Sequence, residues 1–245
     1  NELPKDLPNL RTLILASNKL TSINENLINT ITSYEKLEII DLSLNYLTQI
    51  PNQILKIRTL TRINIFGNRI SSIDLSNSKI ITIDCGQNWF ENTPQVSPNI
   101  QYLCLDMNFL NFIDLSTIPN LTRLSYRINQ ITSISSKAFF PQLQVLDLSY
   151  NKLKEIPDLS KMTPNLKIFD ASYNEIVKFP KFPRSIIEIN LQTNQIETIP
   201  DELINYSTLG TLNLSENRLE RIPKIPHILF ALLLNKNRIK SFDGS

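Results

Sequence analysis

Apolar residues recur along the chain in a fixed pattern, which is clearest in the segment LEIIDLSLNYL at residues 37–47. Ile40 and Leu42 are two residues apart, the spacing that turns two side chains to the same face of a β-strand. Asn45 follows three residues after Leu42, where the predicted strand ends. Its carboxamide both donates and accepts hydrogen bonds, so it can satisfy backbone groups that a turn leaves unpaired. The segment therefore predicts a short strand followed by an asparagine-stabilised turn.

The same pattern returns from one end of the chain to the other. Eleven copies align, with intervals of 20 to 27 residues between successive asparagines. A repeat of this length predicts a solenoid, in which each copy is one structural unit stacked on the next. We therefore interpret residues 1–245 as a single domain of about eleven repeats. Its turns would hold a structural asparagine ladder made by Asn18, Asn45, Asn68, Asn88, Asn108, Asn129, Asn151, Asn174, Asn194, Asn217 and Asn237.

The motif L-x-x-L-x-L-x-x-N-x-L resembles that of the leucine-rich repeat family, and the resemblance covers essentially the whole chain. It implies an α/β, β-rich solenoid: a right-handed superhelix with a parallel β-sheet on its concave face. Most connections between the strands are short and contain proline, which discourages full helices, so we expect thin outer segments and an open arc. The longest interval holds a stretch with helical spacing at 24–36, which predicts a short helix on the outer face. The segments IPNQILKI and IPDELINY predict single helical or 3₁₀ turns.

The composition of the chain limits which kinds of partner it can bind and where in the cell it is expected. A net charge of +2 is close to neutral, which argues against binding to nucleic acid. The longest apolar run, residues 228–234, is far shorter than the ~18 residues that a membrane-spanning helix needs. In the repeat register Cys85 points inward and Cys104 outward, so no disulfide is expected between them. Secreted members of the family usually carry cysteine-rich caps and none is visible here, so we expect an intracellular, cytoplasmic location.

No set of residues for catalysis stands out. The chain has one histidine, His227, so a Ser-His-Asp or Cys-His arrangement cannot be assembled. No Cys-x-x-Cys motif, histidine cluster or glycine-rich phosphate loop occurs. We therefore predict no catalytic residues, no metal site and no cofactor, and we expect this chain not to be an enzyme.

When the copies are aligned, each position of the repeat forms a column of equivalent residues. The columns that face away from the core are the most informative about function. The fifth residue of each copy lies between two inward side chains and is often Asp or Asn, although both are poor strand formers. One explanation is that short polar groups suit a crowded, solvated sheet, and the other is a surface that binds a partner. Aromatic, Met and Arg residues, which are favoured at interface centres, gather in copies three to six. The predicted partner-binding residues are Arg62, Asn64, Phe66, Asp84, Tyr102, Asp106, Met107, Arg123, Arg127, Asp147 and Asp170. Trp89 and Phe109 would lie on the adjacent rim.

The final copy, LFALLLNKNRI, departs from the pattern. Its outward positions hold Phe230, Ala231 and Leu233, so the predicted strand is apolar on both faces. The end of a solenoid exposes the edge of its core and an unpaired strand. We therefore predict a contact site at Phe230 and Leu233 that a following domain or a partner covers, and weak self-association through this repeat.

These observations favour a protein–protein recognition module that binds its partner through the concave face. Leucine-rich repeats of this type are often joined to signalling domains, and the chain opens in the middle of the pattern. The alternative is therefore the regulatory or targeting domain of a signalling enzyme, such as a type 2C serine/threonine phosphatase, an adenylyl cyclase or a kinase, whose catalytic domain lies outside this chain. The short proline-containing repeats also suggest an effector that acts on a host.

Overall fold

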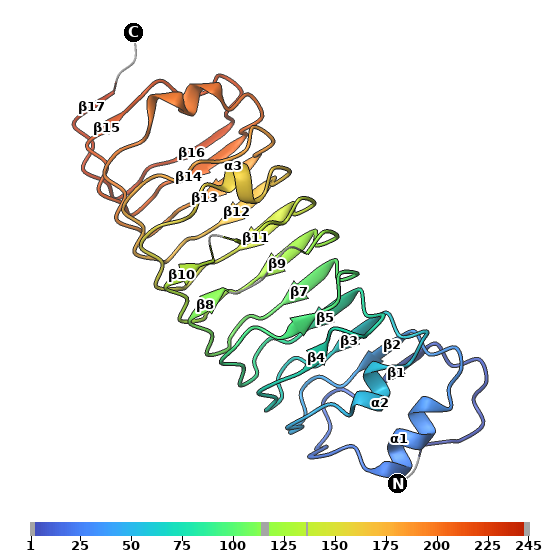
Figure 1. The fold of residues 1–245 in the computed structure, drawn as a ribbon. Coiled ribbons are helices and arrows are strands. Elements are labelled where there is room, and N and C mark those ends of the chain that lie inside the picture. The colour runs from blue at the N-terminus through green and yellow to red at the C-terminus, as the bar shows by residue number, and fades with distance from the viewer. Residues whose placement is uncertain (1–2, 114–117, 136, 243–245) are drawn as a thin grey trace. The chain divides into compact units, whose positions relative to one another are not determined.

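The computed structural model describes residues 3–113, 118–135 and 137–242. By the contacts within it, the chain forms two compact units, residues 1–110 and 111–245. In Figure 1 the first unit runs from blue to green and the second from green to red. The two units are described one after the other, and the interpretation of the whole chain as one domain stays a prediction.

Unit 1 is built on parallel strands that pair in register. Leu13, Ile40, Ile63, Ile83 and Leu103 stand at the middle of successive strands and follow one another across the sheet. The strands in the described part of this unit are β1 (Thr12–Ile14), β2 (Ile39–Asp41), β3 (Arg62–Asn64), β5 (Thr82–Asp84) and β7 (Tyr102–Cys104). The predicted parallel sheet is therefore confirmed in this unit.

Unit 2 repeats the arrangement, again with parallel pairing in register between neighbouring strands. Its strands in the described residues are β9 (Arg123–Ser125), β11 (Val145–Asp147), β12 (Ile168–Asp170), β13 (Glu188–Asn190), β14 (Thr211–Asn213) and β16 (Ala231–Leu233). The middle residue of each strand except β16 is buried, whereas its two neighbours are partly exposed on the side opposite the core. In both units we call that side of the sheet the open face.

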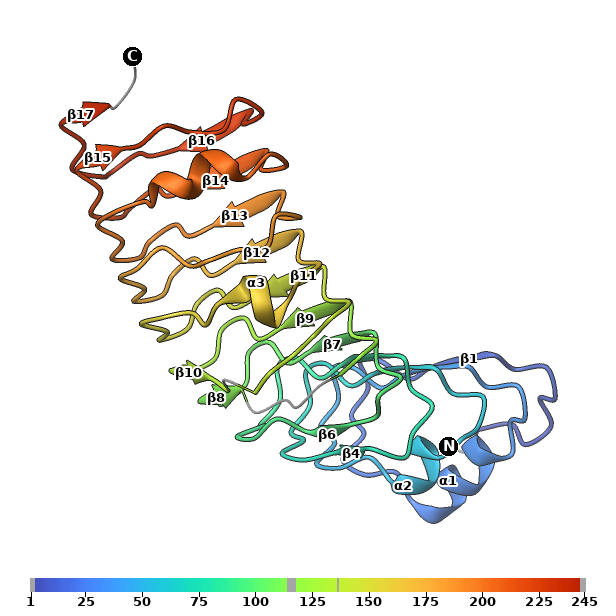
Figure 2. The same cartoon turned by 45° about the horizontal axis from the view of Figure 1, so that its top comes forward.

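The connections on the outer side of unit 1 are thin, as the prolines predict. The helix expected at 24–36 is α1 (Glu25–Thr32), and the Asn24 side chain caps it by accepting the Leu27 N–H at 2.9 Å. The single turn α2 (Asn52–Leu55) confirms the prediction for IPNQILKI, and Figures 1 and 2 show α1 and α2 side by side. The pair β4 (Asp74–Leu75) and β6 (Gln95–Val96) was not predicted.

The outer side of unit 2 has the same character. The 3₁₀ helix η1 (Asp201–Asn205) confirms the turn predicted for IPDELINY, and α3 (Leu159–Met162) is a further single turn. Two short parallel pairs complete it: β8 (Phe112–Ile113) with β10 (Ser133–Ile134), and β15 (Arg221–Ile222) with β17 (Ser241–Phe242). Because these segments are short, few residues separate the core from solvent on this side.

The core of each repeat is made by the apolar positions of the motif. In the copy at 37–47 the side chains of Leu37, Ile40, Leu42 and Leu47 are fully buried. Burial of one such side chain contributes about 1.5–3 kcal/mol relative to leaving it in water. Since every repeat supplies a similar set, the core grows along the stack and each repeat depends on its neighbours for cover.

The asparagine ladder is present, and Asn151 illustrates its bonds. The Asn151 Nδ2 donates to the carbonyls of Tyr126, Leu148 and Ser149 at 2.9, 3.0 and 3.2 Å, and Oδ1 accepts the Ile131 N–H at 2.9 Å. Asn151 thus satisfies backbone groups of its own repeat and of the preceding one. The ladder asparagines from Asn45 to Asn217 are buried, whereas Asn18 is exposed and Asn237 is half-buried.

The residue before each ladder asparagine has a left-handed backbone. In the described residues φ lies between 51° and 59° at ten such positions that are not glycine, and it is 67° at Gly67. A left-handed conformation costs a residue with a Cβ roughly 1–2 kcal/mol. The hydrogen bonds of the ladder on both sides of this residue hold the chain in the tight turn despite that cost.

The two cysteines are free, as expected. Cys85 is inward and fully buried. Cys104 aligns with Asp84 in the column that faces away from the core, yet only 6% of its surface is exposed. Its thiol hydrogen bonds with Asp84 and Tyr102, and burial raises the pKa of this thiol. Cys104 thus lies in the outward column as predicted, and the neighbouring polar side chains enclose its sulfur.

Candidate functional site

The polar residues at the fifth position of the repeat have a structural role. In each case the side-chain Oδ1 accepts the backbone N–H two residues further on, at 2.8 to 3.2 Å. This Asx turn closes the end of the strand, which explains why Asp and Asn are frequent there despite their low strand propensity. The residues that make it are Asp41, Asn64, Asp84, Asp147, Asp170, Asn190 and Asn213.

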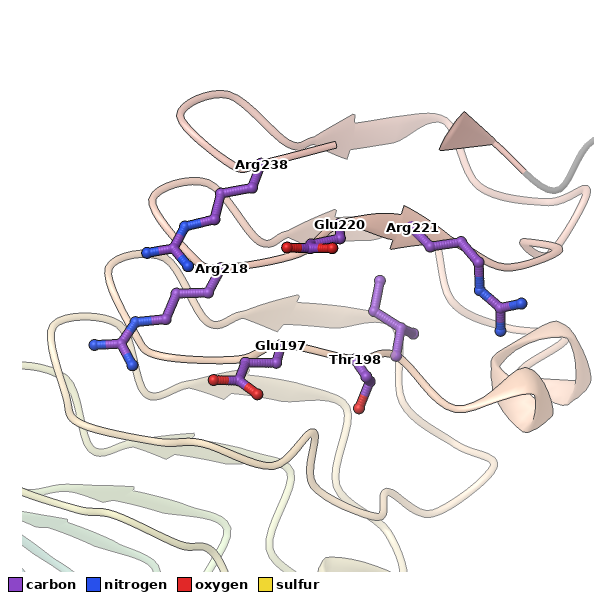
Figure 3. A pocket seen from close by; sticks show the side chains of 7 residues that line it. Glu197, Thr198, Arg218, Glu220, Arg221 and Arg238 are labelled. Atoms are coloured by element: carbon purple, nitrogen blue, oxygen red, sulfur yellow. The ribbon is translucent and has the colours of Figure 1, made fainter. Parts of the chain in front are cut away.

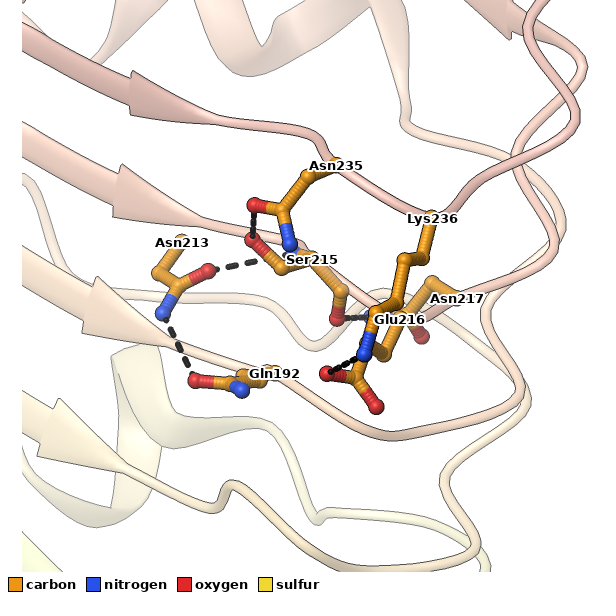
Figure 4. A network of polar contacts seen from close by, with 7 residues as sticks. All are labelled: Gln192, Asn213, Ser215, Glu216, Asn217, Asn235 and Lys236. Carbon is orange, nitrogen blue, oxygen red and sulfur yellow. Dashed lines mark hydrogen bonds and ion pairs between the residues drawn. The ribbon is translucent and has the colours of Figure 1, made fainter.

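These turns are also linked across the open face of unit 2. The Asn190 Nδ2 donates to the Asp170 Oδ2 at 2.8 Å, and the Asn213 Nδ2 donates to the Gln192 Oε1 at 3.2 Å. Figure 4 shows how the network continues from Ser215, whose hydroxyl donates to the Asn235 Oδ1 at 2.6 Å. Polar groups on this face are therefore held in fixed positions before any partner arrives.

In unit 1 the predicted residues occupy neighbouring rows of the open face. Arg62 on β3 and Tyr102 on β7 stand in the same row, with Thr82 of β5 between them. Arg62 is exposed and Tyr102 is half-buried. Asn64 and Asp84 pair with each other in the next row. The Phe66 ring packs against Gly86. Asp106 is half-buried, and the exposed Met107 lies directly before the ladder asparagine Asn108.

Burial sets the electrostatics around Asp84. Burial raises the pKa of the Asp84 carboxyl above its usual value, although hydrogen bonds from the Gly86 N–H and the Cys104 thiol lower it. The carboxylates of Asp106 and Asp41 add to the increase. Burial also raises the pKa of the Tyr102 hydroxyl. This part of the open face is therefore poorly solvated and burial disfavours the charged form of Asp84, whereas Arg62 is exposed at its edge.

In unit 2 the predicted residues lie next to an aromatic stack. The Arg127 guanidinium lies 5.2 Å from the centre of the Tyr150 ring, which itself stacks on Tyr173 at 4.2 Å and 9°. Arg123 is exposed on β9. Asp147 and Asp170 are neighbours in register on β11 and β12.

Tyr150 and Tyr173 were missed as candidates. Both stand directly before a ladder asparagine, in the left-handed position, and both are exposed. An aromatic residue directly before a ladder asparagine is visible in the sequence. Its exposure can be inferred only once the turn is known to direct this side chain outward.

The predicted contact site on β16 is exposed. Phe230 is 82% exposed, and its ring lies over Gly210, where it would collide with any added Cβ. Leu233 is 40% exposed on the same strand. The inward residues Leu229, Leu232 and Leu234 are only half-buried. Contact of this strand with a partner, or with a second copy, stays a prediction.

A hollow of about 390 Å³ lies in unit 2 beside the turns, and Figure 3 shows the side chains that line it. Arg218 and Arg238 extend in the same direction, with the carboxylates of Glu197 and Glu220 beside them. Glu220 pairs with Lys240 at 3.2 Å, and Arg221 pairs with Asp201 at 3.9 Å. Positive and negative side chains alternate around this hollow. Its electrostatic potential is therefore mixed in sign and does not favour an anion or a cation.

Within the residues that the structure describes, no group of three His, Cys, Asp or Glu side chains is placed to hold a metal ion. The helices in the same ranges are all too short or too polar to cross a membrane.

The parallel sheet, the buried ladder and the thin outer segments define a protein of the leucine-rich repeat class. Comparison with protein families agrees, since the model of the family described as leucine rich repeat matches residues 8–70 and 119–176. The chain therefore belongs to the leucine-rich repeat family. This fold is typically used to recognise other proteins.

Proteins with similar sequences or structures occur in vertebrates and in bacteria. Leucine-rich repeats and immunoglobulin-like domains protein 3 of Homo sapiens is 29% identical over 170 residues, or 64% of this chain and 15% of that protein. Toll-like receptor 2 type-1 of Gallus gallus is 29% identical over 148 residues, or 59% of this chain and 18% of that receptor. The structure of YopM, a leucine-rich effector protein from Yersinia pestis, superimposes with a TM-score of 0.78 and 26% identity over 98% of this chain and 64% of that chain. The chain thus spans less than a fifth of the curated relatives it matches.

Proposed function

We propose that this chain binds a protein partner through the open face of its sheet, the concave face of the sequence prediction. The observation that carries the proposal is the stack of Arg127, Tyr150 and Tyr173 in unit 2, at the turns that follow strands β9, β11 and β12 of the open face. Tyr and Arg are the residue types that most often dominate the energy of protein interfaces. Here their rings and guanidinium are exposed but already ordered by mutual contact, so little side-chain entropy remains to be lost on binding.

The predicted residues of unit 1 extend the proposal. Arg62 and Tyr102 share a row on the open face, and the half-buried carboxyl group of Asp84 lies in the next row. A guanidinium and a carboxyl group next to an aromatic ring favour a partner of mixed polarity over a phosphate backbone. Since the Asx turns fix the backbone at the ends of these strands, the surface presents a rigid target.

The test is capture of proteins from an extract of the source organism by the immobilised chain. Two variants probe the two units: Arg62→Glu with Tyr102→Ala, and Arg123→Glu with Arg127→Glu. A matched control, Lys178→Glu, changes the charge at an exposed residue outside the parallel sheet. We expect proteins captured by the wild type and the control to be lost from at least one of the two variants, with unchanged circular dichroism spectra. Equal capture by all four chains would refute the proposal.

The likeness to YopM favours a narrower second candidate, an effector that recognises a protein of a host cell. Support comes from the extent of the superposition, which covers nearly the whole chain. The same capture experiment with a host-cell extract separates the two candidates. Capture from the host extract alone supports an effector, whereas capture from the organism's own extract alone contradicts it. A role in targeting a signalling enzyme, and an intracellular location, stay predictions that the neighbouring gene sequence and fractionation would test.

A further inference from the structure

An apolar groove lies in unit 1 beside the asparagine turns. It has a volume of about 380 Å³ and is lined at its rim by five large apolar side chains, each 42% to 52% exposed. These are Leu44, Tyr46, Trp89, Met107 and Phe109. We call this feature the turn groove. Large exposed apolar patches on a folded protein often mark a site of interaction.

The repeat itself places these side chains. Leu44 and Met107 occupy the left-handed position before a ladder asparagine, whereas Tyr46, Trp89 and Phe109 follow one. The backbone N–H groups of the three aromatic residues donate to carbonyls of the preceding repeat at 2.8 to 2.9 Å. These bonds fix the backbone positions from which the three rings project, and so they set where the groove lies.

The polar floor of the groove is turned inward. Asn88 lies between Trp89 and Gln87, and its Nδ2 donates to the Ile65, Cys85 and Gly86 carbonyls at 2.9 to 3.1 Å. Its Oδ1 accepts the Ile70 N–H at 3.0 Å. The ladder thus uses its hydrogen-bonding groups inside the turn, and the large exposed side chains around the groove are apolar apart from Arg69 and Gln87.

One charged residue lines the groove among the described residues, namely Arg69. Its guanidinium lies 4.8 Å from the centre of the Tyr46 ring, which holds the positive charge beside the apolar rim. The groove therefore offers an apolar surface with a cation at its edge. A sugar would need more polar side chains than Arg69 and Gln87 supply above the floor, because its hydroxyls must be hydrogen-bonded.

We propose that the turn groove binds an extended segment of a protein partner that presents bulky apolar side chains next to a carboxylate. The apolar side chains would cover Trp89, Met107 and Phe109, and the carboxylate would pair with Arg69. Trp, Tyr, Met and Arg are the types enriched at the centres of protein interfaces. This site lies on the turns of unit 1, and Met107 in its lining was also predicted for the open face. Arg69 and Trp89, which the variants below change, are not among the residues proposed for the open face, so their loss of binding reports on this site.

Trp89 allows a direct test, because it is the one tryptophan in the sequence. The chain is used to select binders from a random-peptide phage library that lacks tryptophan, and the enriched peptides are synthesised. We expect sequences that combine bulky apolar residues with Asp or Glu. Each should shift the Trp89 emission to shorter wavelength and protect it from quenching by acrylamide, since it covers the indole. A lack of enrichment, or enriched peptides that leave the emission unchanged, would overturn the proposal.

Variants separate the two parts of the recognition. Trp89→Ala should abolish binding of the fluorescently labelled peptide, and Arg69→Glu should weaken it by about tenfold or more. A peptide with Lys in place of its carboxylate should bind Arg69→Glu better than the wild type. The matched control is Lys152→Glu, a charge reversal at the same position of the repeat but in unit 2. Equal loss with the control, or binding of phosphatidylcholine vesicles that produces the same shift in emission, would show that the occupant is not the proposed peptide.

Discussion

The asparagine ladder makes a quantitative prediction because neighbouring rungs share acceptors. The Leu148 carbonyl accepts from Asn151 at 3.0 Å and from Asn174 at 2.9 Å. The Tyr126 carbonyl likewise accepts from Asn129 and Asn151. Removal of one rung therefore leaves each of these carbonyls with a donor, and only the double removal of Asn151 and Asn174 takes both donors from Leu148.

The magnitude for a single rung follows from this arrangement. In Asn151→Ala the buried Ile131 N–H loses its acceptor, and an unsatisfied buried donor costs about 1–3 kcal/mol. The shared carbonyls lose one of two bonds each, which adds about 1 kcal/mol in total. We therefore expect Asn151→Ala to lower the free energy of unfolding by about 2–4 kcal/mol. Asn18→Ala is the matched control, because this exposed rung bonds to the Leu15 and Ala16 carbonyls of its own turn.

The shared carbonyl then predicts coupling between rungs. Asn151→Ala with Asn174→Ala should cost about 1–3 kcal/mol more than the sum of the single changes, because Leu148 loses both donors. Asn151→Ala with Asn194→Ala should be additive, since Asn194 bonds to the carbonyls of Ala171, Leu191 and Gln192 and shares none with Asn151. Urea unfolding followed by circular dichroism measures all of these free energies. If the adjacent pair is as additive as the separated pair, the shared-acceptor reasoning is wrong.

Two further predictions concern Asp84 and the exposed strand β16. Burial raises the pKa of the Asp84 carboxyl in the folded state above its value in the unfolded chain. The protonated carboxyl therefore favours folding at a pH below the unfolded pKa, and this contribution to the free energy of unfolding is lost as the pH rises through the folded pKa. Asp84→Asn should therefore raise the free energy of unfolding at neutral pH, and the gain should vanish in acid; a gain that persists in acid would contradict this assignment. Phe230→Ser with Leu233→Asn should reduce self-association measured by light scattering, since both side chains are exposed on β16. A wild type that stays monomeric at high concentration would contradict it.

The repeat register predicted the fold well because one motif determines both the strand and the turn. Ile40, Leu42 and Asn45 stand where the pattern places them, since burial and hydrogen bonding at these positions depend only on residues one repeat away. The partly enclosed Cys104 could not be predicted, because its burial depends on the rotamers of Tyr102 and Asp84. The turn groove was only half visible in the sequence. Trp89 and Phe109 were assigned to a rim, but the contribution of Leu44 and Tyr46 requires knowledge of where a left-handed turn directs its side chains.

The left-handed residue before each ladder asparagine has a consequence for how such a protein changes over time. Its backbone is dictated by the hydrogen bonds on either side, and residues as different as Ser17, Tyr173, Glu216 and Lys236 adopt it with φ between 55° and 59°. The turn thus accepts small, aromatic, acidic and basic side chains at this position. Substitution there changes the side chain that the surface presents to a partner and leaves the turn in place. The chain therefore carries a row of positions at which a single substitution can change which partner the surface binds.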